Sequence, residues 1–250
     1  MSGLTRNKSF IGKGTIYVCE KASDGGFLTL GNCSELSLAI SEEKQEQADY
    51  QNAGGGVIAS VSRIGSVTAS VTALSLSANN VGLALRGLIN THASAVIVDE
   101  THTAYTGAFV PFEHLPDTAE AITVTNSAGD TTYTVDVDYA IRNAGIEIIE
   151  GSTITNATEI KIGYTSLAGY DIEGLKAASK KYEVVFDGLN EADSGRPVLV
   201  KMHNVQFNPT QALALISEDF GNLPMTFDLL KDETITGSGE SQYFKMQVTE

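Results

Sequence analysis

Short runs in which apolar and polar residues alternate dominate the chain and predict β-strands. In residues 35–41 every second position is apolar, and the alternation returns in residues 66–72 and 182–187. Further strands are expected at 198–207 and 223–230. Side chains two positions apart share one face of a strand, so each alternating run gathers its apolar residues on one side. Because runs with long helical spacing are nearly absent, the pattern predicts a mainly β fold.

A long polar segment separates the first two of these strands. Residues 42–56 are rich in charged and amide side chains and end in the triplet Gly54-Gly55-Gly56. The segment is too long for a tight hairpin turn. We therefore expect either a disordered loop or a loop that contacts something outside its own domain, with the glycines as a hinge.

One short helix is expected directly after the second strand. Ser77-Ala78-Asn79-Asn80 is typical of a helix N-cap, and residues 81–87 read as a brief helix that Gly87 ends.

The pattern changes in the middle of the chain. Residues 96–166 hold several short strands at near-regular spacing, among them 121–125 and 131–135, which flank a turn. This spacing predicts a small β-sandwich of the immunoglobulin type. Because the first pattern returns after residue 167, we expect an inserted domain at 96–166 within a discontinuous domain made of 1–95 and 167–250.

Composition limits the classes of function. The 250 residues are 42% hydrophobic and 19% charged, which is typical of a soluble globular protein. With 31 acidic against 16 scattered basic residues the net charge is −15, so the chain lacks the basic stripe of a protein that grips DNA. The acidity serves either solubility or a surface that repels a polyanion. We expect no secretory signal, no membrane span, and reduced thiols at Cys19 and Cys33.

Motifs that carry catalytic or metal chemistry are not found. The four histidines have neither HExxH nor HxH spacing, and no CxxC is present. The glycine triplet opens a strand, unlike a phosphate-binding loop, and no Gly-x-Ser-x-Gly elbow exists. The sequence therefore predicts no enzyme, no cofactor and no metal ligand. The histidines are expected on strands or at the surface: His92, His102, His114 and His203.

Three aspartates in the inserted segment leave two alternatives open. Asp130, Asp136 and Asp138 could hold Ca²⁺ through carboxylate oxygens, or they could line a solvated strand face, which we prefer. The absence of tryptophan counts against a carbohydrate-binding platform.

The order of several segments resembles the tail tube protein of long-tailed bacteriophages (siphophages). These segments are the glycine-bounded strand at 12–18, Leu30-Gly31-Asn32, the acidic loop, the Ser/Thr/Val strand, residues 77–87 and residues 223–232. The resemblance covers residues 12–95 and 167–250. It implies a tail-tube-like β-sandwich or barrel whose subunits form rings, hexameric as in that family, that stack into a tube in the virion tail.

The same resemblance implies partners and surfaces. The partners would be other copies of the chain and the tape measure, tail terminator and tail tip proteins, with DNA passing non-specifically through the lumen during ejection. Assembly would follow synthesis in the bacterial host cytoplasm. The expected inter-ring contacts are Glu42, Glu43, Glu46, Asp49, Tyr50, Gly54, Gly55 and Gly56. The expected residues of an acidic, DNA-repelling lumen are Ser37, Ser41, Thr68, Ser70, Thr72, Glu183 and Asp187.

A binding module is the alternative. The inserted sandwich would then make the protein an adhesin or decoration module that recognises a host cell surface. A tube subunit predicts rings or tubes in the purified protein, whereas a binding module predicts a discrete particle that binds cells.

Overall fold

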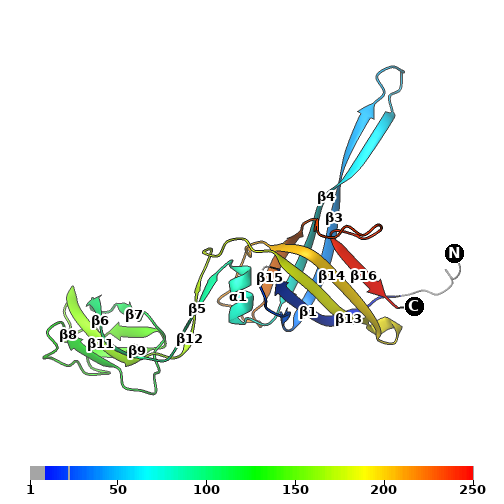
Figure 1. The fold of residues 1–250 in the computed structure, drawn as a ribbon. Coiled ribbons are helices and arrows are strands. Elements are labelled where there is room, and N and C mark those ends of the chain that lie inside the picture. The colour runs from blue at the N-terminus through cyan, green and yellow to red at the C-terminus, as the bar shows by residue number, and fades with distance from the viewer. Residues whose placement is uncertain (1–8, 22, 250) are drawn as a thin grey trace. The chain divides into compact units, whose positions relative to one another are not determined.

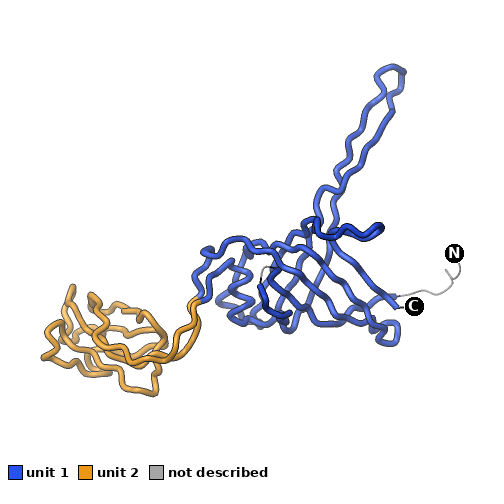
Figure 2. Tube along the Cα trace, in the orientation of Figure 1, with its two compact units in different colours: residues 1–89, 172–250 blue, residues 90–171 orange. Residues whose placement is uncertain are grey.

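The computed structural model describes residues 9–21 and 23–249 (Figure 1). The chain forms two compact units, residues 1–89 with 172–250 (unit 1) and residues 90–171 (unit 2) (Figure 2). Strands are the main regular secondary structure of both units, so the predicted mainly β fold is confirmed. The inserted unit is longer at each end than the predicted 96–166, because it takes in parts of two additional paired strands, β5 (Leu88–His92) and β12 (Gly169–Glu173).

Unit 1 is organised around one eight-stranded antiparallel sheet. Its strands follow the order β2 (Leu28–Thr29), β1 (Gly12–Glu20), β13 (Tyr182–Asn190), β14 (Arg196–Phe207), β15 (Leu223–Leu229), β4 (Val57–Ala73), β3 (Cys33–Ala48), and β16 (Phe244–Val248) also pairs with β14. β14 pairs with β16 over its first half and with β15 at its end, so the sheet divides there. A 3-10 turn, η1 (Glu191–Asp193), joins β13 to β14.

The core of unit 1 lies on one face of this sheet. Val67, Ala69, Val71 and Ala73 of β4 are all buried, and the residues between them are only partly covered. Helix α1 (Ala78–Ala84) packs on this core through Ala84, with Val81 and Leu83 beside it.

The predicted N-cap at Ser77 is confirmed, but the helix spans Ala78–Ala84 with its C-cap at Leu85, so it begins and ends earlier than the predicted 81–87. The Ser77 Oγ accepts a hydrogen bond from the Asn80 backbone N–H at 3.2 Å, and the Gly87 N–H donates to the Gly82 carbonyl at 2.7 Å. The buried Asn80 side chain donates to the carbonyls of Leu30 and Ser75 at 2.8 and 2.7 Å, which ties the helix to the sheet.

The predicted loop at 42–56 is largely wrong. β3 continues to Ala48 and β4 already begins at Val57, so only residues 49–56 form the turn. There the Asp49 carboxylate accepts from the Gln51 and Asn52 backbone N–H groups at 2.7 and 3.2 Å. The glycine triplet has positive φ angles of 113°, 67° and 149°. Alternation failed as a guide because both faces of this hairpin are exposed, so no buried face imposes a period on the sequence.

Two further segments form no strand. Residues 212–217 are largely apolar, but they form neither a strand nor a helix. In unit 2, β8 (Thr123–Asn126) pairs with β11 (Thr158–Thr165), and residues 131–135 form no strand of their own. The predicted hairpin is formed only in part, because Thr132 bridges to Thr125 and the Tyr133 N–H donates to the Val124 carbonyl at 2.8 Å.

Unit 2 consists mainly of two three-stranded antiparallel sheets. One has the order β7 (Phe109–Pro111), β10 (Gly145–Ile148), β9 (Tyr139–Arg142), and the other the order β6 (Val96–Ala104), β11, β8. Its own core is rich in isoleucine, with Ile146, Ile154, Ile160 and Ile162 fully buried. Unit 2 therefore buries an apolar centre without residues from unit 1.

Asp138 holds the loops of unit 2 together, which corrects the preferred placement on a solvated face. Its side chain is buried and accepts from the Thr134 N–H, the Thr153 N–H and the Thr153 hydroxyl, at 2.8–2.9 Å. These bonds lower the pKa of the Asp138 carboxyl below its usual value. Asp130 instead lies exposed in a turn beside Asn126. Within the described residues, the three aspartates do not gather into a set of possible metal ligands.

Both cysteines are free thiols and half-buried. In the part of the chain that the structure describes, no helix has the length and apolar character that a membrane crossing needs.

Candidate functional site

The β3–β4 hairpin continues past the sheet as a two-stranded arm, residues 42–66 (Figure 1). β15 pairs with β4 only between Thr68 and Ala73, so the sheet stops where the arm begins. The pairing of β3 with β4 shifts register between Ser41 and Glu42, opposite Gly65. A Cβ at Gly65 would lie 3.0 Å from the side chains of Ser41 and Glu43, so this close approach favours glycine.

The two strands of the arm differ in chemistry. The β3 side carries charged residues, among them Glu42, Glu43, Lys44 and Glu46, and Lys44 forms an ion pair with Glu46. The β4 side carries four large apolar residues that are each 54–57% exposed. These are Val57, Ile58, Val61 and Ile64.

The arm has an open edge. Along residues 57–66 the side of β4 that faces away from β3 pairs with no other strand among the described residues. Unpaired main-chain groups on such an edge are a template for another strand, and a two-stranded hairpin alone is only marginally stable in water. Open backbone and exposed apolar side chains therefore coincide on one strand, which is typical of a surface that another chain covers.

All eight predicted inter-ring residues lie in the arm. Glu42, Glu43 and Glu46 are on its β3 strand, and the others are in or beside its turn, where Tyr50 is 91% exposed. Sequence reasoning missed the four apolar residues of β4. Their signal was a cluster of β-branched residues without the alternation that a half-buried strand requires.

The seven predicted lumen residues share the polar face of the unit 1 sheet, opposite its core. Paired residues in an antiparallel sheet point to the same side. Ser37 lies opposite Ser70 with hydroxyl oxygens 2.7 Å apart, and Ser41 and Ser66 are paired likewise at 2.8 Å. The face continues across the sheet through the pairs Ser70–Thr226, Thr68–Asp228, Asp228–Gln206 and Leu199–Asp187.

The charge of this face is mixed. Glu183 lies 2.7 Å from the ammonium of Lys201, and Lys201 stands opposite Lys245 on β16. Asp187 faces Thr15 and Leu199, and no ion pair of Asp187 occurs among the described residues. The expectation of an acidic wall therefore rests on Asp187 rather than on Glu183.

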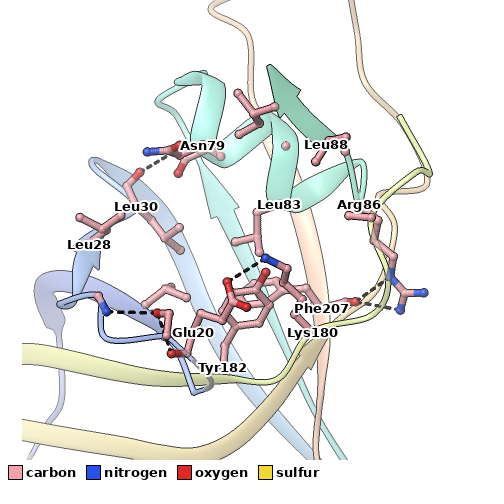
Figure 3. A pocket seen from close by; sticks show the side chains of 18 of the residues that line it. Glu20, Leu28, Leu30, Asn79, Leu83, Arg86, Leu88, Lys180, Tyr182 and Phe207 are labelled. Atoms are coloured by element: carbon pink, nitrogen blue, oxygen red, sulfur yellow. Dashed lines mark hydrogen bonds and ion pairs between the residues drawn. The ribbon is translucent and has the colours of Figure 1, made fainter. Parts of the chain in front are cut away.

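A cavity of about 780 Å³ opens in unit 1 between the β1–β2 hairpin, α1 and residues 176–182 (Figure 3). Its lining is largely apolar, from Leu28, Leu30, Leu83, Tyr182 and Phe207 among others.

Three basic side chains line the same cavity: Arg86, Lys176 and Lys180. Arg86 donates two hydrogen bonds to the Phe207 carbonyl at 3.2 and 2.9 Å (Figure 3). Lys180 pairs with Glu20 at 2.9 Å, and this bond raises the pKa of Lys180. The cavity therefore offers an apolar interior with basic groups around it.

The irregular segment 211–222 (the 211–222 loop) exposes its largest apolar residues. Leu215, Ile216 and Phe220 are 85%, 97% and 100% exposed, and Glu218 and Asp219 lie between them. Just before the loop, Thr210 donates from its N–H to the Ala84 carbonyl and from its hydroxyl to the Pro224 carbonyl, both at 2.7 Å. An anchored loop with fully exposed apolar side chains is a second surface suited to a partner.

In unit 2 the fold brings two histidines and an aspartate together. His92 is on β5, Asp171 is on β12, and His114 follows β7. The His92 Nδ1 lies 3.1 Å from the Asp171 Oδ2, and the rings of His92 and His114 are 4.8 Å apart. Sequence reasoning placed both histidines on strands or at the surface, because no local spacing links these three distant positions. Imidazole and carboxylate donors suit a first-row divalent metal.

A second network in unit 2 surrounds Glu100. Its carboxylate accepts from the Tyr164 hydroxyl at 2.6 Å and lies 2.6 Å from the His102 Nε2. Burial opposes ionisation of Glu100, but these hydrogen bonds prevail and lower its pKa. Burial and the bond to Glu100 raise the pKa of Tyr164 to about 12. Near neutral pH Glu100 therefore stays ionised and Tyr164 stays protonated, which makes this a structural contact rather than an acid–base pair.

The family model described as "Protein of unknown function UCP028589" matches residues 9–247. Because that match spans almost the whole chain, the protein belongs to this family. No curated protein matches the chain.

Proposed function

We propose that this member of the family is the structural subunit of a bacteriophage tail tube, whose rings stack and whose lumen conducts DNA. The single observation that carries the proposal is the arm, which joins an open strand edge to four exposed apolar side chains. The order of segments that resembles the tail tube family, together with the mainly β fold, supports it.

The arm is the proposed contact between rings. A strand of a neighbouring subunit pairs with the open edge of β4 and covers Val57, Ile58, Val61 and Ile64. Each of these residues is about half exposed, so covering it contributes about 1 kcal/mol. The contact repeats at every subunit of a ring, and weak contacts therefore sum to a stable stack.

Contacts within a ring use the second exposed surface. We assign the 211–222 loop of one copy to the apolar cavity of the next, with Phe220 entering it and Glu218 and Asp219 meeting Arg86 and Lys176. The loop and the cavity are different surfaces of the same chain. Such a head-to-tail contact generates a closed ring when its rotation closes.

The polar face of the sheet is the proposed lumen wall. Its hydroxyl side chains, such as Ser37 and Ser70, can bond to each other or to water, and its Lys201 is paired with Glu183. A strongly basic wall would retain DNA by releasing counterions, whereas a polar wall with Asp187 lets the duplex pass. This function requires no catalytic group and no cofactor.

Electron microscopy of the purified protein tests the proposal directly. A tube subunit forms rings or tubes of uniform diameter, and sedimentation shows an assembly that grows with protein concentration. A monodisperse particle that binds bacterial cells would instead favour an adhesin or decoration module and would overturn the tube assignment.

A further inference from the structure

We propose that His92, His114 and Asp171 form a zinc-binding site in unit 2. This inference does not depend on the tail tube function, since all three residues belong to one compact unit. One possible ligand atom from each residue lies within 4.8 Å of the other two.

The pair formed by His92 and Asp171 already has the spacing of two zinc ligands. Nitrogen and oxygen ligands bind zinc at roughly 2.0–2.2 Å, so two of them in a tetrahedral site lie about 3.2–3.6 Å apart. The His92 Nδ1 and the Asp171 Oδ2 are 3.1 Å apart on the paired strands β5 and β12. An ion replaces their hydrogen bond with little movement of either side chain.

The backbone of β12 fixes which nitrogen of His92 is available. A Cβ at Gly169 would lie 3.3 Å from both Cε1 and Nε2 of the His92 ring. The Nε2 edge of the ring therefore rests against the strand, and Nδ1 is directed towards Asp171. Glycine at this position leaves room for the ring.

His114 supplies the third ligand. Its Nδ1 is buried and has no hydrogen-bond partner within the described residues. A buried polar atom without a partner is unfavourable, and a metal ion satisfies a neutral imidazole nitrogen. The His114 backbone N–H donates to the Tyr164 hydroxyl at 3.2 Å, which holds the segment after β7 in place. Rotation of the His114 side chain closes the remaining gap.

Zinc fits this donor set better than calcium or magnesium. Two imidazoles and one carboxylate are typical zinc ligands, whereas calcium and magnesium require mainly oxygen donors. The Asp171 side chain is 45% exposed, so an ion can enter from solvent and keep water in its open position. Bound zinc would link the segment after β7 to both β5 and β12 and would stabilise unit 2.

Zinc titration of the full-length, EDTA-stripped protein by calorimetry tests the site. The parent is expected to bind one zinc ion per chain and no magnesium, and its melting temperature should rise with zinc. Substitution His114→Gln or Asp171→Asn should weaken zinc binding by more than about 100-fold, which exceeds the typical loss for a residue that only orients a ligand. The matched control is His203→Gln on β14 of unit 1, which should bind zinc like the parent.

Cobalt gives a second readout, because its visible bands report nitrogen and oxygen coordination and should vanish in the His114→Gln protein. Circular dichroism without metal establishes whether each variant is folded. If the His114→Gln protein does not fold, the zinc affinity of the Asp171→Asn protein provides the test. The proposal is overturned if the parent binds no zinc below millimolar concentration. It is also overturned if a folded ligand variant binds zinc as tightly as the parent.

Discussion

The two halves of β4 differ in burial and in strand pairing. From Val67 to Ala73 every second residue is buried against the core of unit 1, and β3 and β15 pair on either side. From Val57 to Ser66 every residue is exposed, and only β3 pairs with the strand. The first half is specified by the chain's own core. The second half carries apolar residues that its own fold does not use, and this is the argument for a partner.

Removing the arm should have the largest effect on assembly. Replacing residues 42–65 with Asn-Gly joins Ser41 to Ser66, which already face each other across the hairpin, through a two-residue turn. We expect a folded monomer with an unchanged melting temperature and a complete loss of tubes in electron microscopy. Tubes of normal length from this variant would show that the arm does not join the rings.

The same substitution in each half of β4 sharpens the comparison. Val71→Ala removes methyl groups at a position only 1% exposed, so it should lower the free energy of unfolding of the monomer by about 2 kcal/mol. Val61→Ala acts at a position 54% exposed and should change that free energy by less than about 0.5 kcal/mol.

Assembly should respond in the opposite order. Loss of about 1 kcal/mol per contact in Val61→Ala raises the protein concentration needed for assembly by about fivefold, measured by light scattering. Lys44→Gln, on the charged strand of the arm, is the control. Equal assembly of Val61→Ala and the parent would contradict an apolar contact at this edge.

Sequence patterns could predict the first half of β4 but not the second. Ser66–Thr72 alternates because one of its faces is buried within the chain, and the cap at Ser77 is a local signal. The end of β3 was missed because Glu42–Ala48 has no buried face to impose a period. His92, His114 and Asp171 could not be linked beforehand, since only the pairing of β5 with β12 and the path after β7 bring them together.

The contact between the 211–222 loop and the cavity is tested by a substitution at Phe220, and its effect on assembly should exceed that of Val61→Ala. Phe220 is completely exposed in the subunit, so Phe220→Ala should leave the monomer's stability unchanged while ring formation weakens by about tenfold or more. Sedimentation velocity measures the rings, and a lower melting temperature of the Phe220→Ala monomer would instead show that the loop fills the cavity of its own chain.

A charge exchange tests the same contact independently. Glu218→Lys and Lys176→Glu should each weaken ring formation, and the double variant should recover part of the loss, because the exchanged charges attract again. If the double variant is as weak as the sum of the singles, these two residues do not meet in the ring.

The smallest expected effect is a pH dependence of stability that arises mainly in the rest of unit 1 rather than in the arm. Asp232 forms an ion pair with Lys21 and accepts from the Thr234 hydroxyl at 2.6 Å. These bonds lower the pKa of Asp232 to about 2, against about 3.9 in an unfolded chain. A depressed carboxyl pKa adds stability that is complete above about pH 4 and is lost as the pH falls towards about 2.

Asp49 in the arm provides the matched case, since hydrogen bonds from the Asn52 side chain and the Gln51 N–H also lower its pKa. Asp49 holds only the exposed turn, whereas Asp232 joins the end of β1 to the segment after β15. In urea unfolding between about pH 2.5 and 5, Asp232→Asn should therefore flatten the dependence of the unfolding free energy on pH, because the titrating carboxyl is gone. Asp49→Asn should flatten the slope much less, because all of its hydrogen bonds lie in the solvent-exposed turn, where water weakens them. A slope that changes in the Asp49 variant and persists in the Asp232 variant would mean that the arm contributes to the stability of the body, and the division of β4 into two independent halves would then be wrong.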